Sequence, residues 1–170
     1  SFCDFYKTIS PDINNNELLT TILESTSKPL YVSTGMSDLK DIEEFTYKYE
    51  KYSDRIILIH TQLDYDIEFV NLKVITLLKE QFPFEVAYGN HCKNLDVLYT
   101  AIGFEPESIF VYLKGRSDVV HPDDKHAIEL VNLERMSKNI ENLKLSLGSP
   151  QKTKMGNKIR QLYEEKSNSS

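Results

Sequence analysis

The sequence predicts an α/β fold built from about five parallel βα units, and two patterns support this prediction. Five short runs rich in β-branched and aromatic residues, which we expect to be strands, lie at residues 2–8, 29–34, 55–61, 84–87 and 108–113. Their starts are 27, 26, 29 and 24 residues apart, and each run is followed by a polar turn and a helical pattern. Such a near-constant period, with strands too apolar to alternate, is typical of βα units repeated around a parallel sheet.

Amphipathic stretches between the strands predict the helices. Ser37 is the expected N-cap of one helix, with Asp38 in its first turn. Its apolar positions fall on one face, at Leu39, Ile42, Phe45 and Tyr49. A longer stripe ends at Gly148 and comprises Leu133, Met136, Ile140, Leu143 and Leu147. We interpret both stripes as packing faces, because a helix that covers a sheet must present one.

Length and composition indicate one domain with an appended tail. With 170 residues, 40% of them hydrophobic, the chain can bury one core. We place this domain at residues 1–148 and interpret residues 149–170 as a polar C-terminal tail or linker, either a surface helix or a frayed segment. Cys3 and Cys92 are too few for a disulfide framework, so we expect both to be reduced.

The charge and the apolar runs exclude two classes of partner. A net charge of -6 without a cluster of Lys and Arg argues against nucleic acid, whose phosphates require concentrated positive charge. The longest apolar runs, such as residues 56–60, are far shorter than the roughly 18 to 20 residues that cross a bilayer. The N-terminus also lacks a basic-then-apolar signal pattern. We therefore expect no membrane contact and a cytoplasmic location.

Five units are too few for a closed barrel of this kind. A closed (β/α) barrel uses eight strands and about 250 residues. Five parallel strands would leave two sheet edges and half of an apolar interior exposed. Either the sheet stays open, or something else completes it.

Five stretches of the chain resemble the sialic acid synthase (NeuB-type) family, in the same order and at similar spacings. They read KTISPDINNNELL, KPLYVSTGMSDLKDIEE, LIHTQLDYD, YGNHCKN and NIENLKLSLGS, and they span residues 7–148. The resemblance implies a partial TIM-type barrel in which the chain supplies strands 4 to 8 and lacks the first three. It also implies condensation of phosphoenolpyruvate (PEP) with an N-acetylated amino sugar, assisted by a divalent metal such as Mn or Mg.

The first of these stretches offers three polar side chains where a barrel site is built. Lys7, Ser10 and Asp12 lie at the carboxyl end of the first predicted strand. The resemblance implies that Lys7 and Ser10 bind PEP, and that Asp12, where the family has Glu, contacts the sugar as a catalytic residue. Alternatively, Lys7 ends a strand, and Ser10 to Asp12 simply start a helix at Asn14 or Asn16.

The Ser-Thr-Gly turn at residues 33–35 is a second candidate. Gly35 would let the backbone approach a ligand or adopt a positive φ, and the hydroxyls of Ser33 and Thr34 lie beside the exposed amides of the next helix start. An ordinary βα turn has the same composition. The resemblance favours substrate binding by Ser33 and Thr34.

His91 matches a histidine that binds metal in the family, but its second ligand is missing from the motif pattern. The family's Glu-Lys-His-Phe segment aligns with residues 111–114, which places Lys114 where a ligand is expected. Tyr65 is kept, and we assign it a catalytic role. Two phosphate contacts implied by the resemblance are replaced, one by Leu63 and one by Gly89. We therefore expect metal binding to be weak or lost.

Two other groups of histidines are weaker candidates. His121, Asp123, Asp124 and His126 form a compact cluster of metal-ligand types, but the stretch has the composition of a solvated loop. His60 lies within an apolar strand, where we expect a hydrogen-bonded core histidine.

Three functional hypotheses remain from the sequence. The leading one is a degenerate NeuB-type domain that does not perform the condensation alone, since reaction requires PEP, metal and sugar held in productive geometry. The second is one part of an active synthase completed by missing strands or by a partner chain. The third is a non-catalytic interaction module. We expect either a homo-oligomer or a complementing chain.

Overall fold

A five-stranded parallel sheet forms the centre of the molecule, as expected. The computed structural model describes residues 2–115, 118, 120, 122–152 and 156–167. The sheet has the order β1 (Tyr6–Thr8), β2 (Leu30–Ser33), β3 (Ile56–Thr61), β4 (Glu85–Gly89) and β5 (Ile109–Phe110). Every pair is parallel, and strands adjacent in sequence are adjacent in the sheet. Within the described residues, β1 and β5 each pair on one side only, so the curled sheet is a half-barrel.

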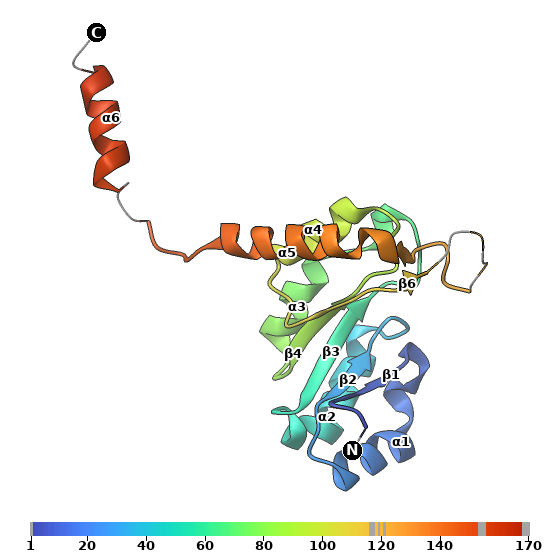
Figure 1. Cartoon of the computed structure of the whole chain (residues 1–170). Helices are drawn as coiled ribbons and strands as arrows, with labels where there is room; N and C mark the ends of the chain where they lie inside the picture. The colour runs from blue at the N-terminus through green and yellow to red at the C-terminus, as the bar shows by residue number, and fades with distance from the viewer. Residues whose placement is uncertain (1, 116–117, 119, 121, 153–155, 168–170) are drawn as a thin grey trace.

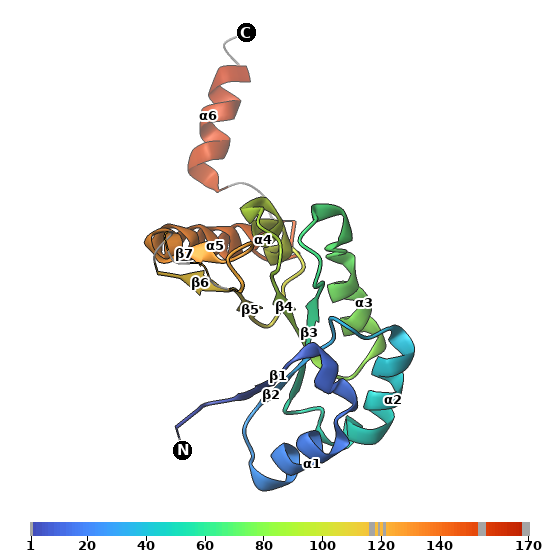
Figure 2. The ribbon, with the colours of Figure 1, turned by 90° about the vertical axis from the view of Figure 1, so that its right-hand side faces the viewer.

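Helices cover the outer face of this half-barrel. Helices α1 (Asn16–Ser25), α2 (Leu39–Tyr49), α3 (Lys73–Gln81) and α4 (Leu95–Ile102) lie on one side of the sheet, and α5 (Leu133–Leu147) packs against α4 (Figures 1 and 2). Four short 3-10 helices connect these elements: η1 (Ser10–Asn14), η2 (Glu50–Tyr52), η3 (Ile67–Phe69) and η4 (Leu130–Asn132). The main core lies between sheet and helices, where Leu30, Val32, Leu58 and Val86 are fully buried.

The opposite, concave face carries a smaller apolar cluster. Ile57, Ile59, Ala87 and Tyr31 point to this face, and each of the four is at most 9% exposed. The expectation of an exposed apolar interior is therefore wrong for these residues. Aromatic rings from the two ends of the sheet cover them. Phe5, Tyr31 and Phe110 pack edge to face, with centroids 5.1 to 6.2 Å apart.

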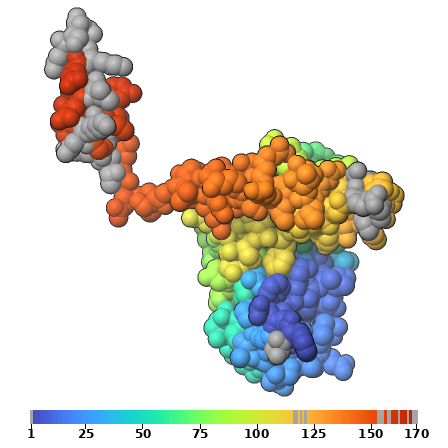
Figure 3. Space-filling view, viewed as in Figure 1, coloured from blue at the N-terminus to red at the C-terminus, as the bar shows by residue number. Residues whose placement is uncertain are grey.

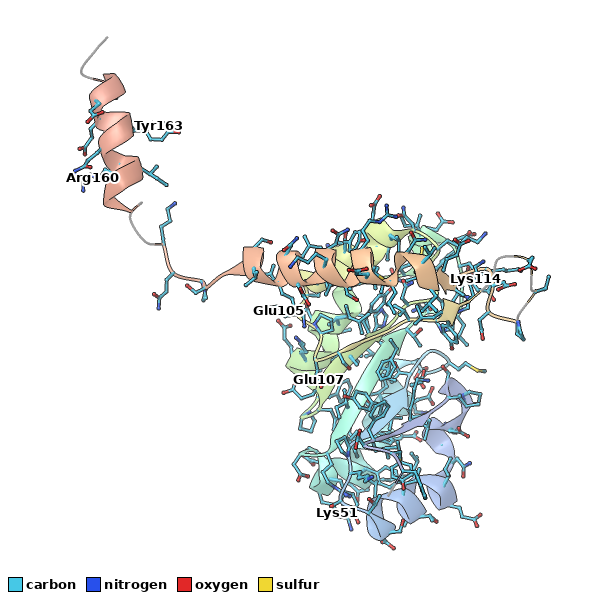
Figure 4. All side chains as sticks on the ribbon, in the orientation of Figure 1. Lys51, Glu105, Glu107, Lys114, Arg160 and Tyr163 are labelled. Carbon is cyan, nitrogen blue, oxygen red and sulfur yellow. The ribbon has the colours of Figure 1, made fainter. Side chains whose placement is uncertain are left out.

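The last predicted strand is divided in two. The run at residues 108–113 forms β5 and then, after a break, β6 (Leu113–Lys114). β6 pairs in parallel with β7 (Ile128–Glu129), which the sequence analysis did not predict. This small second sheet lies beside the beginning of α5, near Lys114 (Figure 4). β7 leads into η4 and α5.

Residues 149–170 contain a helix, α6 (Asn157–Ser167). It stands apart from the half-barrel (Figures 1 and 3). The predicted stripe of α5 ends as expected at Gly148, whose φ of 62° lies in the region that favours glycine. Burial along the stripe decreases from Met136, which is buried, to Leu147, which is 43% exposed. Among the described helices, none has the length and apolarity that a membrane crossing requires.

The N-cap of α2 is Asp38, and the prediction of Ser37 is wrong by one residue. Asp38 accepts a hydrogen bond from the amide of Asp41 at 2.9 Å, and the Asp41 carboxylate accepts one from the amide of Asp38 at 3.0 Å. Asp38→Ala should lower the free energy of unfolding by about 1 kcal/mol, because the amide of Asp41 loses its capping acceptor. Ser37→Ala, its matched control, should change stability by less than about 0.5 kcal/mol. Urea unfolding of both variants tests the assignment, and equal losses would contradict it.

Candidate substrate site

A cavity of about 260 Å³ opens at the carboxyl ends of the strands, on the concave side. Successive strands contribute to its lining: Lys7 from β1, Ser33 from β2, Thr61 from β3, Gly89 from β4 and Phe110 from β5. His91 and Tyr112, which follow β4 and β5, complete its polar lining. The alternation of side chains along each strand places these residues on the concave face. The strands and the residues that follow them therefore gather one cation, three hydroxyls and one imidazole in a single cavity.

Lys7 supplies the positive charge of this cavity. Its ammonium lies 5.9 Å from the ring centroid of Phe110. Although the side chain as a whole is exposed, desolvation lowers the pKa of Lys7. No carboxylate within the described residues forms an ion pair with it. Lys7 can therefore attract an anion into the cavity.

Ser10 and Ser33 act together at the cavity wall. Their hydroxyl oxygens share a hydrogen bond of 2.9 Å, and both residues are buried. Thr34 is also buried, but its hydroxyl donates to the carbonyl oxygen of Ile59 at 2.9 Å, on the neighbouring strand. The structure thus places Ser33 in the cavity, Ser10 directly behind it, and Thr34 in a structural contact with β3.

The glycine that follows Thr34 is required for space. A Cβ atom built on Gly35 would lie 2.8 Å from the hydroxyl oxygen of Ser10 and 2.8 Å from the methyl carbon of Thr61. The φ of Gly35 is not positive, so glycine is needed here for the close approach of neighbouring side chains and not for a left-handed backbone. The turn therefore packs directly against two residues of the cavity region.

His91 stacks against a second histidine from a distant loop. The rings of His91 and His126 are 4.6 Å apart at an interplanar angle of 28°, and Tyr112 packs edge to face against both. His126 is 3% exposed, and neither of its ring nitrogens has a hydrogen-bond partner among the described residues. Its Nε2 lies 3.8 Å from a carboxylate oxygen of Asp123, which is too long for a hydrogen bond.

Burial lowers the pKa of both histidines. For His91, the neighbouring His126 and Lys7 lower the pKa further, while Asp123 opposes the shift. For His126, Asp123 again opposes the effect of burial. At neutral pH both rings are therefore uncharged, which suits a stacked pair.

A buried amide holds the loop that carries His91. Asn90 is 1% exposed, accepts a hydrogen bond from the Tyr88 hydroxyl at 3.0 Å and donates one to the carbonyl oxygen of Cys92 at 2.9 Å. The amide bridges the residues on both sides of His91. This arrangement requires one acceptor and one donor on the same side chain, which Asn provides.

The structure places the two predicted catalytic residues differently. The ring of Tyr65 stacks on that of His126, with centroids 5.4 Å apart, and His126 in turn stacks on His91. Asp12 does not line the cavity; its carboxylate accepts a long hydrogen bond of 3.4 Å from the amide of Ile9 and caps η1. The catalytic roles of both residues stay predictions.

The remaining histidine predictions have mixed outcomes. His60 is confirmed as a core histidine, since it is 2% exposed and its Nε2 donates to the carbonyl oxygen of Val70 at 2.9 Å. Burial lowers the pKa of His60. In the loop cluster, His121 lies outside the described residues, and His126 turns toward His91.

Sequence reasoning missed one residue of this site, Thr61, and one contact, that of His126 with His91. Thr61 lines the cavity with a buried hydroxyl that has no partner among the described residues. The alternation of Ile57, Ile59 and Thr61 along β3 is a signal that could have identified it. The contact of His126 with His91 had no comparable signal, since 35 positions of sequence and an irregular loop separate them.

Two of the known proteins with similar sequences are N,N'-diacetyllegionaminic acid synthases. The chain is 27% identical over 148 residues to N,N'-diacetyllegionaminic acid synthase of Campylobacter jejuni. The matched segment covers 84% of this chain and 44% of that protein. It is 25% identical over 138 residues to the synthase of the same name from Legionella pneumophila, covering 77% of this chain and 39% of the relative. The chain thus spans less than half the length of these relatives.

Solved structures support the same grouping at the level of fold. The N-acetylneuraminic acid synthetase of Leptospira borgpetersenii, determined with citrate, superposes with a TM-score of 0.84 at 21% identity, covering 98% of this chain and 59% of that chain. A truncated 3-deoxy-D-arabino-heptulosonate 7-phosphate synthase from Thermotoga maritima gives 0.73 at 12% identity, covering 86% of this chain and 60% of that one. The family model described as the NeuB family matches residues 1–152, and the chain therefore belongs to the NeuB family.

Proposed function

We propose that this chain is a half-barrel of a nonulosonic acid synthase type that binds the anionic substrate PEP but does not complete the condensation alone. The observation that carries the proposal is the convergence of Lys7, Ser33 and Thr61 in one cavity at the carboxyl ends of three adjacent strands. An ammonium beside hydroxyl groups is a suitable environment for phosphate or carboxylate oxygens. The citrate bound by the Leptospira relative is consistent with an anion at such a site.

The reacting carbonyl would require additional activation, and the described residues offer little for it. Enzymes of the NeuB family use a metal. In the described part of the chain, no three His, Cys, Asp or Glu side chains are grouped so that they could hold an ion. The stacked rings of His91 and His126 also face each other, so their nitrogens do not converge on one point. The described residues therefore do not fit a metal ion in this arrangement.

Replaced contacts further support the non-catalytic part of the proposal. Leu63, which stands where the resemblance implies a polar phosphate contact, is 43% exposed and apolar. Gly89 carries no hydroxyl at the other implied contact. Each missing contact removes part of the stabilisation that a charged transition state requires.

Lys7→Met tests PEP binding directly. Isothermal titration of the purified chain with PEP should give a measurable affinity that the variant weakens by about tenfold or more, since charge-assisted hydrogen bonds contribute about 1.5–3 kcal/mol. Lys48→Met is the matched control, because Lys48 is an exposed lysine in the last turn of α2 and does not line the cavity. Equal affinities of the chain and the Lys7 variant would contradict the proposed binding site.

A turnover assay tests the second part of the proposal. Incubation of the chain with PEP, Mn²⁺ and N-acetylmannosamine should release no phosphate above the background without protein. Release of phosphate together with formation of a nonulosonic acid would contradict a non-catalytic role. The two measurements are independent, so PEP binding can be supported while the absence of catalysis is refuted.

The sheet edges favour a second candidate, in which a partner completes an active barrel. β5 pairs only with β4 among the described strands. Beside it, a cavity of about 610 Å³ is lined by Ile109, Ile140 and Leu147, next to the labelled residues Glu105 and Glu107 (Figure 4). A parallel strand added at this edge would cover apolar surface between β5 and α5.

This candidate can be tested by mixing the chain with the N-terminal half of the Campylobacter relative. Native mass spectrometry of the mixture measures complex formation, and a synthase assay measures its turnover. A monomeric chain without turnover would count against it.

A further inference from the structure

The pairing of β3 with β4 places a hydroxyl beside an empty side-chain position. Thr61 and Gly89 are register partners on these two strands, and both line the cavity that contains Lys7. A Cβ atom built on Gly89 would lie 3.2 Å from the Thr61 hydroxyl oxygen, 3.1 Å from its Cβ and 3.0 Å from a methyl carbon of Ile59. The Thr61 side chain therefore occupies the space into which a side chain at position 89 would extend.

Two glycines flank the side chain of Thr61. Its methyl group faces the turn at Gly35, where a built Cβ would lie 2.8 Å away. Its hydroxyl oxygen faces Gly89, whose built Cβ would lie 3.2 Å away. The absence of a side chain at both positions leaves room for this orientation of Thr61.

The hydroxyl of Thr61 has no partner of its own. Thr61 is 3% exposed, and its oxygen makes no hydrogen bond among the described residues. A buried hydroxyl without a partner costs free energy, so such groups in native structures call for an explanation. An anion bound in the cavity would accept this hydrogen bond.

Resting on the PEP-binding function proposed above, we propose that Thr61 is an anion-binding residue whose hydroxyl replaces, from β3, the contact that Gly89 cannot make from β4. The ligand oxygen belongs to a phosphate or carboxylate group that also contacts Lys7. The hydroxyl of Thr61 stands on β3 at the register position of Gly89 on β4, and on the same face of the sheet. The Thr61 hydroxyl can take this place only while residue 89 has no side chain that would collide with it.

Thr61→Val is the first test, because valine keeps the shape of threonine and removes only the hydroxyl. Its affinity for PEP, measured by isothermal titration, should fall about tenfold or more, whereas Thr61→Ser should retain binding. Thr8→Val is the matched control. Thr8 also has a buried hydroxyl without a partner among the described residues, but it directly follows Lys7 on β1 and so points to the opposite face. Titrations with inorganic phosphate and with pyruvate distinguish which anionic group Thr61 contacts.

A reciprocal exchange is the second test. Thr61→Ala should weaken PEP binding and also create room beside Gly89. Adding Gly89→Ser to this variant should restore at least part of the affinity, since the hydroxyl then returns to β4. A folded double variant that binds no better than Thr61→Ala, or a Thr61→Val variant with unchanged affinity, would overturn the inference. If the double variant does not fold, the comparison of Thr61→Val with Thr61→Ser decides.

These outcomes separate the inference from the function on which it rests. If the unmodified chain binds none of PEP, phosphate and pyruvate, the proposed function fails and the inference fails with it. If the chain binds PEP and loses binding with Lys7→Met but not with Thr61→Val, only the inference about Thr61 fails.

Discussion

Asn90→Asp is expected to lower the free energy of unfolding at pH 7.5 by about 3 kcal/mol. The side chain of Asn90 is 1% exposed and bridges Tyr88 and Cys92 as acceptor and donor. An aspartate could still accept from the Tyr88 hydroxyl. It would, however, place a buried negative charge against the carbonyl oxygen of Cys92, which also accepts hydrogen bonds.

The loss should depend on pH in a defined direction. Burial raises the pKa of an introduced carboxyl above the usual aspartate value of about 3.9. The folded variant then binds its proton more tightly than the unfolded one, so the penalty is absent below about pH 4 and grows as the pH rises. Urea unfolding at pH 7.5 and at pH 5.0 should therefore show a smaller difference between variant and unmodified chain at the lower pH.

Asn94→Asp is the matched control for this substitution. Asn94 is the exposed N-cap of α4, and its side chain accepts a hydrogen bond from the amide of Asp96 at 2.8 Å. Aspartate caps helices as well as asparagine does and interacts favourably with the helix dipole. The control should change stability by less than about 0.5 kcal/mol. A pH-independent loss for Asn90→Asp would show that the buried charge is not its cause.

Gly35→Ala is the second substitution with a large expected effect. Its new Cβ atom would lie 2.8 Å from both the Ser10 hydroxyl oxygen and the Thr61 methyl carbon, so one of these residues must move. We expect a loss of about 1–3 kcal/mol in the free energy of unfolding from this overpacking. PEP affinity should also fall, because the displaced residues support and line the substrate cavity. Urea unfolding and isothermal titration measure the two effects.

Gly103→Ala serves as the control for the glycine substitution. A Cβ atom at Gly103 would meet its nearest neighbour, the carbonyl oxygen of Thr100, at 3.4 Å, and the residue has a φ of -66°. Alanine adopts this conformation without strain, so stability should stay unchanged or rise by up to about 1 kcal/mol. If both variants were equally stable, close packing at Gly35 would not be the reason for glycine there.

The parallel sheet could be predicted because its signals are local. Each strand is a short β-branched or aromatic run, and the regular interval between the runs leaves little room for any connection except a helix. The division of residues 108–113 was missed, since a run of apolar residues does not indicate where its backbone stops pairing. Ser37 and Asp38 are both good capping residues, so composition alone could not choose between them.

The site was only partly predictable because its contacts cross the chain. Lys7 and Ser33 lie near the carboxyl ends of their strands, and His91 follows one. Because the carboxyl ends of parallel strands meet, their proximity follows from the fold. The stack of His126 on His91 depends on an irregular loop and on β7, neither of which has a periodic signal. The unpartnered hydroxyl of Thr61 became visible only with the register of β3 and β4 and with the space left by Gly89.

The bridge formed by Asn90 has one further consequence, for the thiol of Cys92. Cys92 is 4% exposed and directly follows His91, whereas Cys3, near the N-terminus, is exposed. An alkylating reagent in solution therefore meets two sulfurs of very different accessibility. Cys3 is modified at the intrinsic rate at which the reagent alkylates an exposed thiol, whereas Cys92 is modified only after the segment around it opens. The rate of Cys92 alkylation, compared with that of Cys3 by mass spectrometry, therefore reports how often this segment opens.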